Sequence, residues 1–498
     1  MFRRSHSPPA STPVPTTAAD AVKEYVLKTE RTKLVQLADN EADWLTVGNF
    51  LQGTQVFGAT GSGKTTGSGR YMALAFLEQN WGGLVLTAKR QDAEQWTEWA
   101  NLCGRAKDII ELKPGGEACF NFLQYEVSKA PENSSPTYDV VNLFINAMGG
   151  DSEGGEDGKY WQDALRQLLH NAIDLALVAG VEVTTERLAN IVRTAPRSDT
   201  EADSPTWQHD SDCWKLLDLA DQRTLPERQR RDFDECAAYW MHEFPSLADK
   251  TRSSIVSTFT SKATALLRNP LRELFASSPG LLQVTPELTL QGKIILVNLP
   301  IKIFGETGRF AQRIVKIVWQ RAMERRKVVP GSPPAFLWSD ESQYFVTPED
   351  SLFQQTARSS LVATVYLTQN LPNYLASIGG RDSRAHVESL LGNLQTKIFH
   401  ANGDPKTNEW AASLIGSDFL SRPTRSMTSG GDHAQDKDSS KFSIGETELM
   451  AHVVKPREFT TLKKAGGLDG VTEAIVFQGG RRWSDTGENY IRAAFSQG

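Results

Sequence analysis

A run of glycine and hydroxyl residues early in the sequence has the composition and spacing of a phosphate-binding loop. In the pattern Gly-x-x-x-x-Gly-Lys-Ser/Thr, residues without bulky side chains let backbone N–H groups turn inward around the phosphates of a nucleotide. Lys64 adds positive charge, and the hydroxyl of Thr65 is a ligand that suits Mg²⁺. The loop therefore predicts a nucleotide site with Mg²⁺, formed by Gly58, Ala59, Thr60, Gly61, Ser62, Gly63, Lys64, Thr65 and Thr66.

An acidic pair far along the chain, Asp340 and Glu341, is the partner that such a loop needs. The pair follows the apolar run 335–339, and the metal-binding carboxylate of such enzymes emerges from a buried strand beside the phosphates. We expect Asp340 to hold Mg²⁺ directly or through water, and Glu341 to orient the attacking water or accept its proton. An acidic pair alone more often marks a solvated strand end. Its place after an apolar run, in a chain with a phosphate loop, favours the catalytic interpretation.

Two further polar residues lie where they could complete this site. Gln369 ends the apolar run 361–368, and from a neighbouring strand its side chain could reach the γ-phosphate; the alternative is a turn before Pro372. Arg358 lies on the helical segment between Glu341 and Gln369, from which a guanidinium could project onto the ATP of a neighbouring subunit. On composition alone Arg358 is a solvated helix residue, so its role as an arginine finger depends on a ring assembly.

Composition limits the kind of protein that carries these motifs. The chain has 498 residues, of which 39% are hydrophobic and 23% charged, as expected for a soluble globular protein of two or more domains. Its four cysteines form no Cys-x-x-Cys pair, so we predict neither a zinc site nor a disulfide framework, and a reducing cytoplasm fits. No apolar run approaches the ~20 residues of a transmembrane helix. We therefore expect a cytoplasmic protein that reaches a membrane only through a partner.

The net charge of −6 argues against a protein that coats nucleic acid with its whole surface, because such binding draws on Lys and Arg. This net charge is compatible with a ring that has a basic pore, since only the loops that face the pore need positive charge.

The order of expected elements accounts for the distance between loop and acidic pair. Apolar runs at 55–57, 83–87 and 108–112 predict strands of a parallel sheet, and the sheet resumes at 293–298 after a long stretch of helical spacing. We expect an α/β fold with an inserted all-α domain. The expected parts are a disordered Ser- and Pro-rich tail (1–30), a first part of the nucleotide-binding domain (31–130), the all-α insert (131–285) and a second part (286–498) with a mobile loop at 421–446.

The order of several motifs resembles that of type IV coupling proteins, the TraG/TraD-like conjugative DNA-transfer ATPases. The motifs are the phosphate loop, Cys119-Phe-Asn-Phe-Leu123, Tyr160-Trp-Gln-Asp-Ala-Leu165, Gly292-Lys-Ile-Ile-Leu-Val-Asn-Leu-Pro300, Asp340-Glu341, Gln369, and Asn393-Leu-Gln-Thr-Lys-Ile-Phe399 before Asp404-Pro405. The resemblance covers about residues 45–485. It implies a RecA-like P-loop ATPase of the HerA-FtsK superfamily, assembled as a homo-hexameric ring that uses ATP and Mg²⁺. Such rings move single-stranded DNA and its attached relaxase into a type IV secretion channel. Lys64, Thr65, Asp340, Glu341 and Gln369 match the family's ATP-site residues, and Arg358 matches the place of its trans-acting arginine.

The chain departs from this family in two places. Family members usually begin with transmembrane helices, whereas this sequence has no such segment, so we expect it to dock on a separate membrane or secretion-channel protein or to belong to a soluble branch. Thr87-Ala88-Lys89 stands where many relatives have an Asp-Pro-Lys-like turn, and the sequence does not indicate the consequence.

Three rivals remain open. A double-stranded DNA pump like FtsK or HerA shares the core and the ring. A small-molecule kinase or GTPase would also bind a nucleotide through Lys64, but such enzymes rarely need a carboxylate like Glu341 beside the metal ligand. An idle adaptor would use ATP only to hold a ring together.

Overall fold

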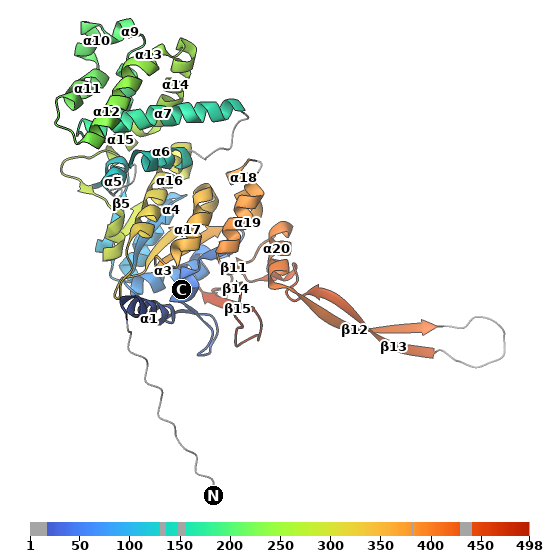
Figure 1. Cartoon of the computed structure of the whole chain (residues 1–498). Coiled ribbons are helices and arrows are strands. Elements are labelled where there is room, and N and C mark those ends of the chain that lie inside the picture. Colours follow the sequence, from blue (N-terminus) through green and yellow to red (C-terminus); the bar gives the residue numbers. More distant parts are fainter. Residues whose placement is uncertain (1–16, 130–135, 148–155, 381, 429–440, 498) are drawn as a thin grey trace.

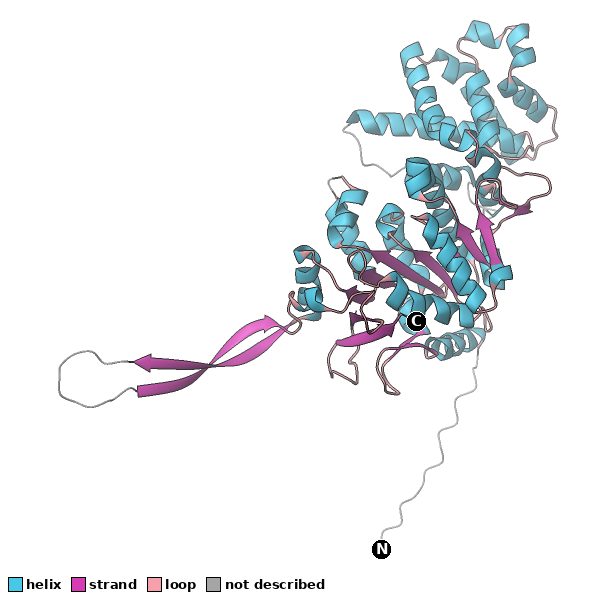
Figure 2. Ribbon diagram, turned by 180° about the vertical axis from the view of Figure 1, so that it is seen from behind, coloured by secondary structure: helices cyan, strands magenta, loops and turns pink. Residues whose placement is uncertain are grey.

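The protein is built around a nine-stranded, mostly parallel sheet (Figures 1 and 2). The computed structural model describes the whole chain except residues 1–16, 130–135, 148–155, 381, 429–440 and 498. From β11 to β5 all neighbouring strands are parallel, whereas β14 and β15 are antiparallel additions at one edge. In order across the sheet, the strands are β15 (Tyr490–Ser496), β14 (Val471–Gln478), β11 (Thr396–His400), β3 (Thr54–Phe57), β10 (Val362–Thr368), β9 (Ala335–Ser339), β4 (Gly82–Leu86), β8 (Ile294–Val297) and β5 (Ile109–Leu112).

The central strands are apolar throughout because helices cover both faces of the sheet. Phe336 and Trp338 of β9 pack in the cluster that contains Phe76 of α3 and Trp96 of α4, and Phe336 stacks on Trp96 at 5.3 Å. Leu337, between them, belongs to the cluster on the other face, with residues of α16. This layering confirms the α/β class with a parallel sheet flanked by helices. The flanking helices are α3 (Arg70–Glu78), α4 (Arg90–Leu102), α16 (Ile301–Arg325), α17 (Pro348–Ala357), α18 (Leu371–Ile378), α19 (Ser383–Asn393) and α20 (Pro405–Ile415).

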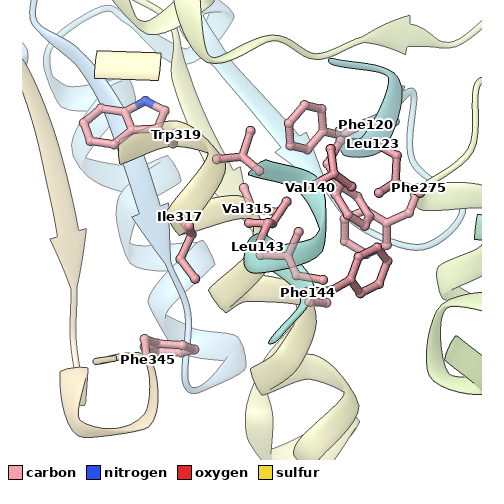
Figure 3. Close-up of a cluster of buried hydrophobic side chains, with 14 of the residues drawn as sticks. Phe120, Leu123, Val140, Leu143, Phe144, Phe275, Val315, Ile317, Trp319 and Phe345 are labelled. Atoms are coloured by element: carbon pink, nitrogen blue, oxygen red, sulfur yellow. The ribbon is translucent and has the colours of Figure 1, made fainter. Parts of the chain in front are cut away.

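A group of helices lies apart from the sheet, at the top of Figure 1. It is inserted between β6 (Ala118–Cys119) and β7 (Leu282–Gln283), and all its described elements are helical. A buried cluster joins it to the helices that cover the sheet: Leu143 and Phe144, from its second helix, lie near Val315 of α16 (Figure 3). The boundaries 131–285 of a separate domain remain a prediction. Its helices are α5 (Phe122–Lys129), α6 (Pro136–Ala147), α7 (Glu156–Val178), α8 (Thr185–Thr194), α9 (Asp199–Ala202), α10 (Pro205–Asp210), α11 (Asp212–Asp221), α12 (Glu227–Ala238), α13 (Phe244–Ser246), α14 (Asp249–Leu267) and α15 (Leu271–Leu274).

The expected disordered tail over residues 1–30 is wrong for its second half, which forms α1 (Ala18–Glu30). The side chain of Thr17 accepts a hydrogen bond from the backbone N–H of Asp20 and caps this helix. Tyr25 then donates its hydroxyl to the backbone oxygen of Ser332 at 2.6 Å. Composition misleads here because the helix is stabilised by residues far away in the sequence; residues 1–16 lie outside the described part.

The expected mobile loop over 421–446 is wrong where it overlaps a long hairpin of β12 (Ser417–Thr428) and β13 (Lys441–His452). The hairpin extends well away from the body of the molecule (Figures 1 and 2). Ser and Thr suggested a loop, yet Thr is favourable in strands, and the hydrogen bonds of a hairpin join backbone groups that Ser and Thr also carry. Residues 429–440 lie outside the described part.

Smaller elements complete the chain. They are β1 (Lys33–Gln36), β2 (Trp44–Thr46), α2 (Val47–Leu51) and α21 (Glu458–Thr461). Over the described residues, no helix is both long and apolar enough to span a membrane.

Candidate nucleotide site

The phosphate loop connects the buried strand β3 to the helical segment that leads into α3. Residues Thr65–Gly69 form a single π-helical turn before α3 begins at Arg70. Gly61 and Gly63 have φ of +72° and +87°, a conformation that glycine adopts without strain. A Cβ on Gly63 would also lie 2.5 Å from Oγ1 of Thr472. The motif's glycines are therefore required by backbone conformation and by close packing.

Two strands from the later part of the chain, β11 and β14, contribute side chains that contact the phosphate loop. Thr472 of β14 donates its hydroxyl to the backbone oxygen of Ser62 at 2.7 Å. Ser68 Oγ lies 2.7 Å from Nε2 of His400, a fully buried histidine at the end of β11. Burial lowers the pKa of His400 to about 3, so this ring is neutral at physiological pH. No pattern in the sequence points to Thr472 or His400, because each contacts the loop only once the sheet has formed.

Asp340 and Thr65 meet directly, although they are far apart in the sequence. The Thr65 hydroxyl donates to Oδ2 of Asp340 at 2.7 Å. Asp340 follows β9, and β10 lies between β9 and β3, so the carboxyl ends of three parallel strands bring the two side chains together. A hydroxyl and a carboxylate oxygen side by side are a donor set that suits Mg²⁺. The expected metal residues therefore fit that ion.

Glu341 turns back toward the phosphate loop because its backbone adopts the left-handed conformation, with φ of +50°. A residue other than glycine rarely adopts this conformation, and such outliers concentrate at functional sites. The Glu341 carboxylate is 3% exposed and accepts hydrogen bonds from Nε2 of Gln343 at 3.0 Å and Nε2 of Gln369 at 3.2 Å. Lys64 Nζ lies 4.0 Å from it. The structure thus brings Lys64, Glu341 and Gln369 together.

The charges around Glu341 decide its ionisation. Burial raises the pKa of this carboxyl, but Lys64, the hydrogen bond from Gln343, and Lys89 outweigh that effect and lower the pKa to about 2. Glu341 is therefore an ionised acceptor at neutral pH.

Lys89 is a site residue that the sequence reasoning missed. It lies in the turn after β4, and its Nζ donates to Oε1 of Glu341 at 3.0 Å. The turn is held by Asp92, whose carboxylate accepts the backbone N–H groups of Ala88 and Lys89 at 2.8 Å each. Thr87-Ala88-Lys89 thus lacks the aspartate and proline of the usual turn but places its lysine on Glu341. The position of Lys89, which aligns with the lysine of the family's Asp-Pro-Lys-like turn, was the one feature of the sequence that pointed to this residue.

Arg358 lies at the amino ends of the strands, on the side of the sheet opposite to the nucleotide site. It precedes β10, whereas Gln369 follows β10, so a strand of seven residues, roughly 20 Å at ~3.3 Å per residue, separates them. Its guanidinium makes a two-pronged ion pair with Glu30 of α1, at 2.6 and 2.9 Å. Arg358 therefore does not act on the nucleotide site of its own chain, and a role on a neighbouring subunit stays a prediction.

A buried network fixes the segment that follows Glu341. Lys316 of α16 donates to the backbone oxygen of Phe345 at 2.7 Å and pairs with Asp350, and both charged side chains are fully buried. Asp350 also accepts hydrogen bonds from Gln320 at 2.9 Å and from Tyr366. This network ties Phe345, in the segment between β9 and α17, and Asp350, in α17, to α16.

Comparison with known families agrees with this geometry. Residues 17–280 match the family model described as "Type IV secretory system Conjugative DNA transfer". The chain belongs to the type IV coupling protein family. Residues 356–475 match a second model, the "Type IV secretion-system coupling protein DNA-binding domain". None of the curated proteins is significantly similar to this coupling protein in sequence.

Solved structures share the fold of this coupling protein. The unbound form of the bacterial conjugative coupling protein TrwBdeltaN70 aligns with a TM-score of 0.59 at 15% identity, covering 96% of this chain and 92% of that one. The plasmid coupling protein TrwB in complex with ADP and Mg²⁺ aligns over the same shares with a TM-score of 0.58 at 15% identity. At this identity the likeness shows the fold, and it supports the RecA-like arrangement expected from the sequence.

Proposed function

We propose that this coupling protein hydrolyses ATP to move single-stranded DNA, with an attached relaxase, to a type IV secretion channel. The observation that carries the proposal is the convergence of Lys64, Thr65, Asp340 and Glu341 at one edge of the sheet, with Thr65 and Asp340 2.7 Å apart. Family membership supplies the context of conjugative DNA transfer. The ADP- and Mg²⁺-bound form of TrwB supports the choice of ligands.

Each residue of the site has a distinct role in this proposal. The backbone of residues 58–66 and the Lys64 ammonium hold the phosphates. Thr65 and Asp340 hold Mg²⁺, which neutralises phosphate charge when bound. Glu341 orients the attacking water and accepts its proton, and Gln369 senses the γ-phosphate.

Lys89 must release Glu341 before a water molecule can be held there. The Glu341 carboxylate accepts hydrogen bonds from Lys89, Gln343 and Gln369 in the structure. Lys89 is the partner best able to leave, because its side chain is 42% exposed and the γ-phosphate offers it a stronger anion. ATP binding would then convert Glu341 from a paired carboxylate into a water-binding one.

The proposal includes a ring, in which Arg358 completes the site of the next subunit. Arg358 and Gln369 lie at opposite ends of β10. In the ring, the surface of one subunit that carries Arg358 would therefore face the surface of its neighbour that carries the nucleotide site. The ion pair with Glu30 would open on assembly. A homo-hexamer that reaches the inner membrane through a separate partner follows the family pattern.

The test is ATPase activity at rising protein concentration, with single- or double-stranded DNA added. We expect specific activity to rise on assembly and to be stimulated most by single-stranded DNA. Equal specific activity in monomeric and assembled fractions would contradict the ring, and preferential stimulation by double-stranded DNA would favour an FtsK- or HerA-like pump.

Mixing two variants tests Arg358 itself. Arg358→Ala supplies intact Glu341, and Glu341→Gln supplies intact Arg358. Each alone should be inactive, since an arginine finger contributes on the order of 10³ to 10⁵ in rate, and a mixture should regain activity. A mixture that stays inactive, or an active Arg358→Ala protein, would remove Arg358 from the site; Glu30→Ala controls for loss of the ion pair.

A further inference from the structure

The two oxygens of the Glu341 carboxylate have different partners. Oε1 accepts a hydrogen bond from Nζ of Lys89 at 3.0 Å and is the oxygen that lies 4.0 Å from Nζ of Lys64. Oε2 accepts a hydrogen bond from Nε2 of Gln343 at 3.0 Å. Gln369 bridges the pair, with its Nε2 3.2 Å from Oε1 and 3.4 Å from Oε2. Because Lys64 belongs to the phosphate loop, Oε1 is the oxygen on the side of the phosphates.

Gln343 is held in turn by the end of β10. Its Oε1 accepts a hydrogen bond from the hydroxyl of Thr368 at 2.7 Å, and the two residues are only 4% and 0% exposed. An ionised carboxylate can only accept hydrogen bonds, so the amide of Gln343 must present its N–H group to Glu341 and its oxygen to Thr368. Every donor from Thr368 through Gln343 therefore points toward the carboxylate.

The turn that follows Glu341 is tied to the same strand through its backbone. The hydroxyl of Ser342 donates to the backbone oxygen of Leu367 at 3.0 Å. Gln343 comes next in this turn, and Thr368, which follows Leu367, is the last residue of β10. The end of β10 thus holds both the turn and, through Gln343, the carboxylate itself.

We propose that the two oxygens of Glu341 have separate roles: Gln343, oriented by Thr368, anchors Oε2, and Oε1 receives the attacking water. Gln343 and Thr368 are then positioning residues, and Oε1 becomes free when Lys89 moves to the phosphates. During hydrolysis the water oxygen bonds to the γ-phosphorus, the bond from that phosphorus to ADP breaks with its electron pair left on ADP, and one water proton passes to Oε1. This inference rests on the proposed function, because it needs Glu341 as the base.

A glutamate benefits from such an anchor because several rotatable bonds separate its carboxylate from the backbone. Holding Oε2 fixes the rotation of the carboxylate, so that Oε1 stays directed toward the phosphates. Lys89 cannot supply this anchor, since its side chain is 42% exposed and it contacts the oxygen that the water needs. A misplacement of about 1 Å can cost on the order of 10² in rate, so the anchor should affect turnover more than ATP binding.

Steady-state ATPase kinetics of Gln343→Met test the anchor. The change keeps the length of the side chain and removes its amide. We expect kcat to fall about 10- to 100-fold, the value of one hydrogen bond to a charged group, while KM for ATP stays at the wild-type value. The unchanged KM separates this role from a general loosening of the site, because Gln343 contacts the carboxylate and not the phosphate loop.

Variants of Thr368 test the second step of the chain. Thr368→Val removes the hydroxyl with little change of shape and should lower kcat about tenfold, the value of one hydrogen bond. Thr368→Ser keeps the hydroxyl and should retain wild-type kcat. The double variant of Gln343→Met with Thr368→Val should be no slower than Gln343→Met alone, because both side chains act through one contact.

Gln354→Met is a matched control, since Gln354 also joins a buried glutamine to a threonine of β10. Its Nε2 donates to Oγ1 of Thr364 at 2.6 Å. Thr364 lies four residues before Thr368, roughly 13 Å along the strand at ~3.3 Å per residue. Gln354→Met should therefore leave kcat unchanged even where Tm falls.

Each contrary outcome overturns a defined part of this inference. Wild-type kcat in Gln343→Met, a loss of kcat matched by a rise in KM, or an equal loss in Gln354→Met would remove the anchoring role. A Thr368→Ser protein as slow as Thr368→Val would remove Thr368. Wild-type turnover by Glu341→Gln would refute the proposed function itself, whereas an inactive Glu341→Gln beside an unaffected Gln343→Met would refute only the anchor.

Discussion

Lys316→Met should destabilise the protein and slow hydrolysis, because Lys316 forms a fully buried ion pair with Asp350. Removing one partner of such a pair typically costs about 3–5 kcal/mol, since the other charge is left buried without compensation. Asp350 keeps the hydrogen bonds from Gln320, Tyr366 and the backbone of Thr347, so we take the lower end, about 3 kcal/mol. For a chain of 498 residues, with an unfolding entropy of about 2.1 cal/mol/K per residue, that corresponds to a fall in Tm of about 3 °C.

Lys316→Met should also displace the carboxylate of Glu341. Lys316 donates to the backbone oxygen of Phe345, which lies in the segment that follows Glu341. Displacement of a catalytic group by about 1 Å can cost on the order of 10² in rate, so we expect kcat to fall at least about tenfold. Thermal unfolding and phosphate release measure the two effects.

Two further variants isolate the cause. Lys302→Met removes an exposed lysine from the same helix and should change neither quantity. Lys316→Met combined with Asp350→Leu should recover stability relative to the single variant, because the orphan charge is gone. If Lys316→Met unfolds at the wild-type temperature, the ion pair of Lys316 with Asp350 does not stabilise the fold.

Three other predictions concern separate features of the chain. Lys89→Met should lower kcat/KM for ATP by about 10- to 100-fold, the value of a hydrogen bond to a charged group, while Arg90→Met, a change of its exposed neighbour, should not. Gly67→Ala should weaken ATP binding, since its Cβ would lie 2.4 Å from Cγ2 of Thr472, and adding Thr472→Ser should restore binding by removing that methyl; no recovery would contradict the packing argument. Burial raises the pKa of Asp174 from 3.8 to about 6, so the folded state binds a proton at this carboxyl more tightly than the unfolded state does. The stabilisation of the fold that results is fully present below pH ~4 and is lost as pH rises through 6. Asp174→Asn should therefore raise stability at pH 8 by up to about 3 kcal/mol and have no such effect near pH 4, and an equal effect at both pH values in thermal unfolding would refute this.

The sequence predicted the part of the site whose signals are local. The phosphate loop is a continuous motif, and the acidic pair follows an apolar run because β9 is buried on both faces. Parallel strands end at one edge of a sheet, so placing Lys64, Asp340 and Gln369 after strands was enough to expect them together.

The sequence could not predict contacts that depend on distant chain segments. Lys89 reaches Glu341 only because β4 lies next to β9, and Thr472 supports the phosphate loop only because β14 adds to the edge of the sheet. Composition did not predict the helix α1 for the same reason, because this helix is held by a hydrogen bond from Tyr25 to the distant residue Ser332.

The measurement that tests the central claim most directly is ATP turnover and ATP binding by Glu341→Gln, compared with wild type and with Glu98→Gln, a change of an exposed glutamate. If Glu341 activates the water, the variant should bind ATP within a few-fold of wild type while turnover falls by about 10² to 10⁴. Glu98→Gln should match wild type in both. Wild-type turnover by Glu341→Gln would contradict the account, because no catalytic base would then remain at the site as described.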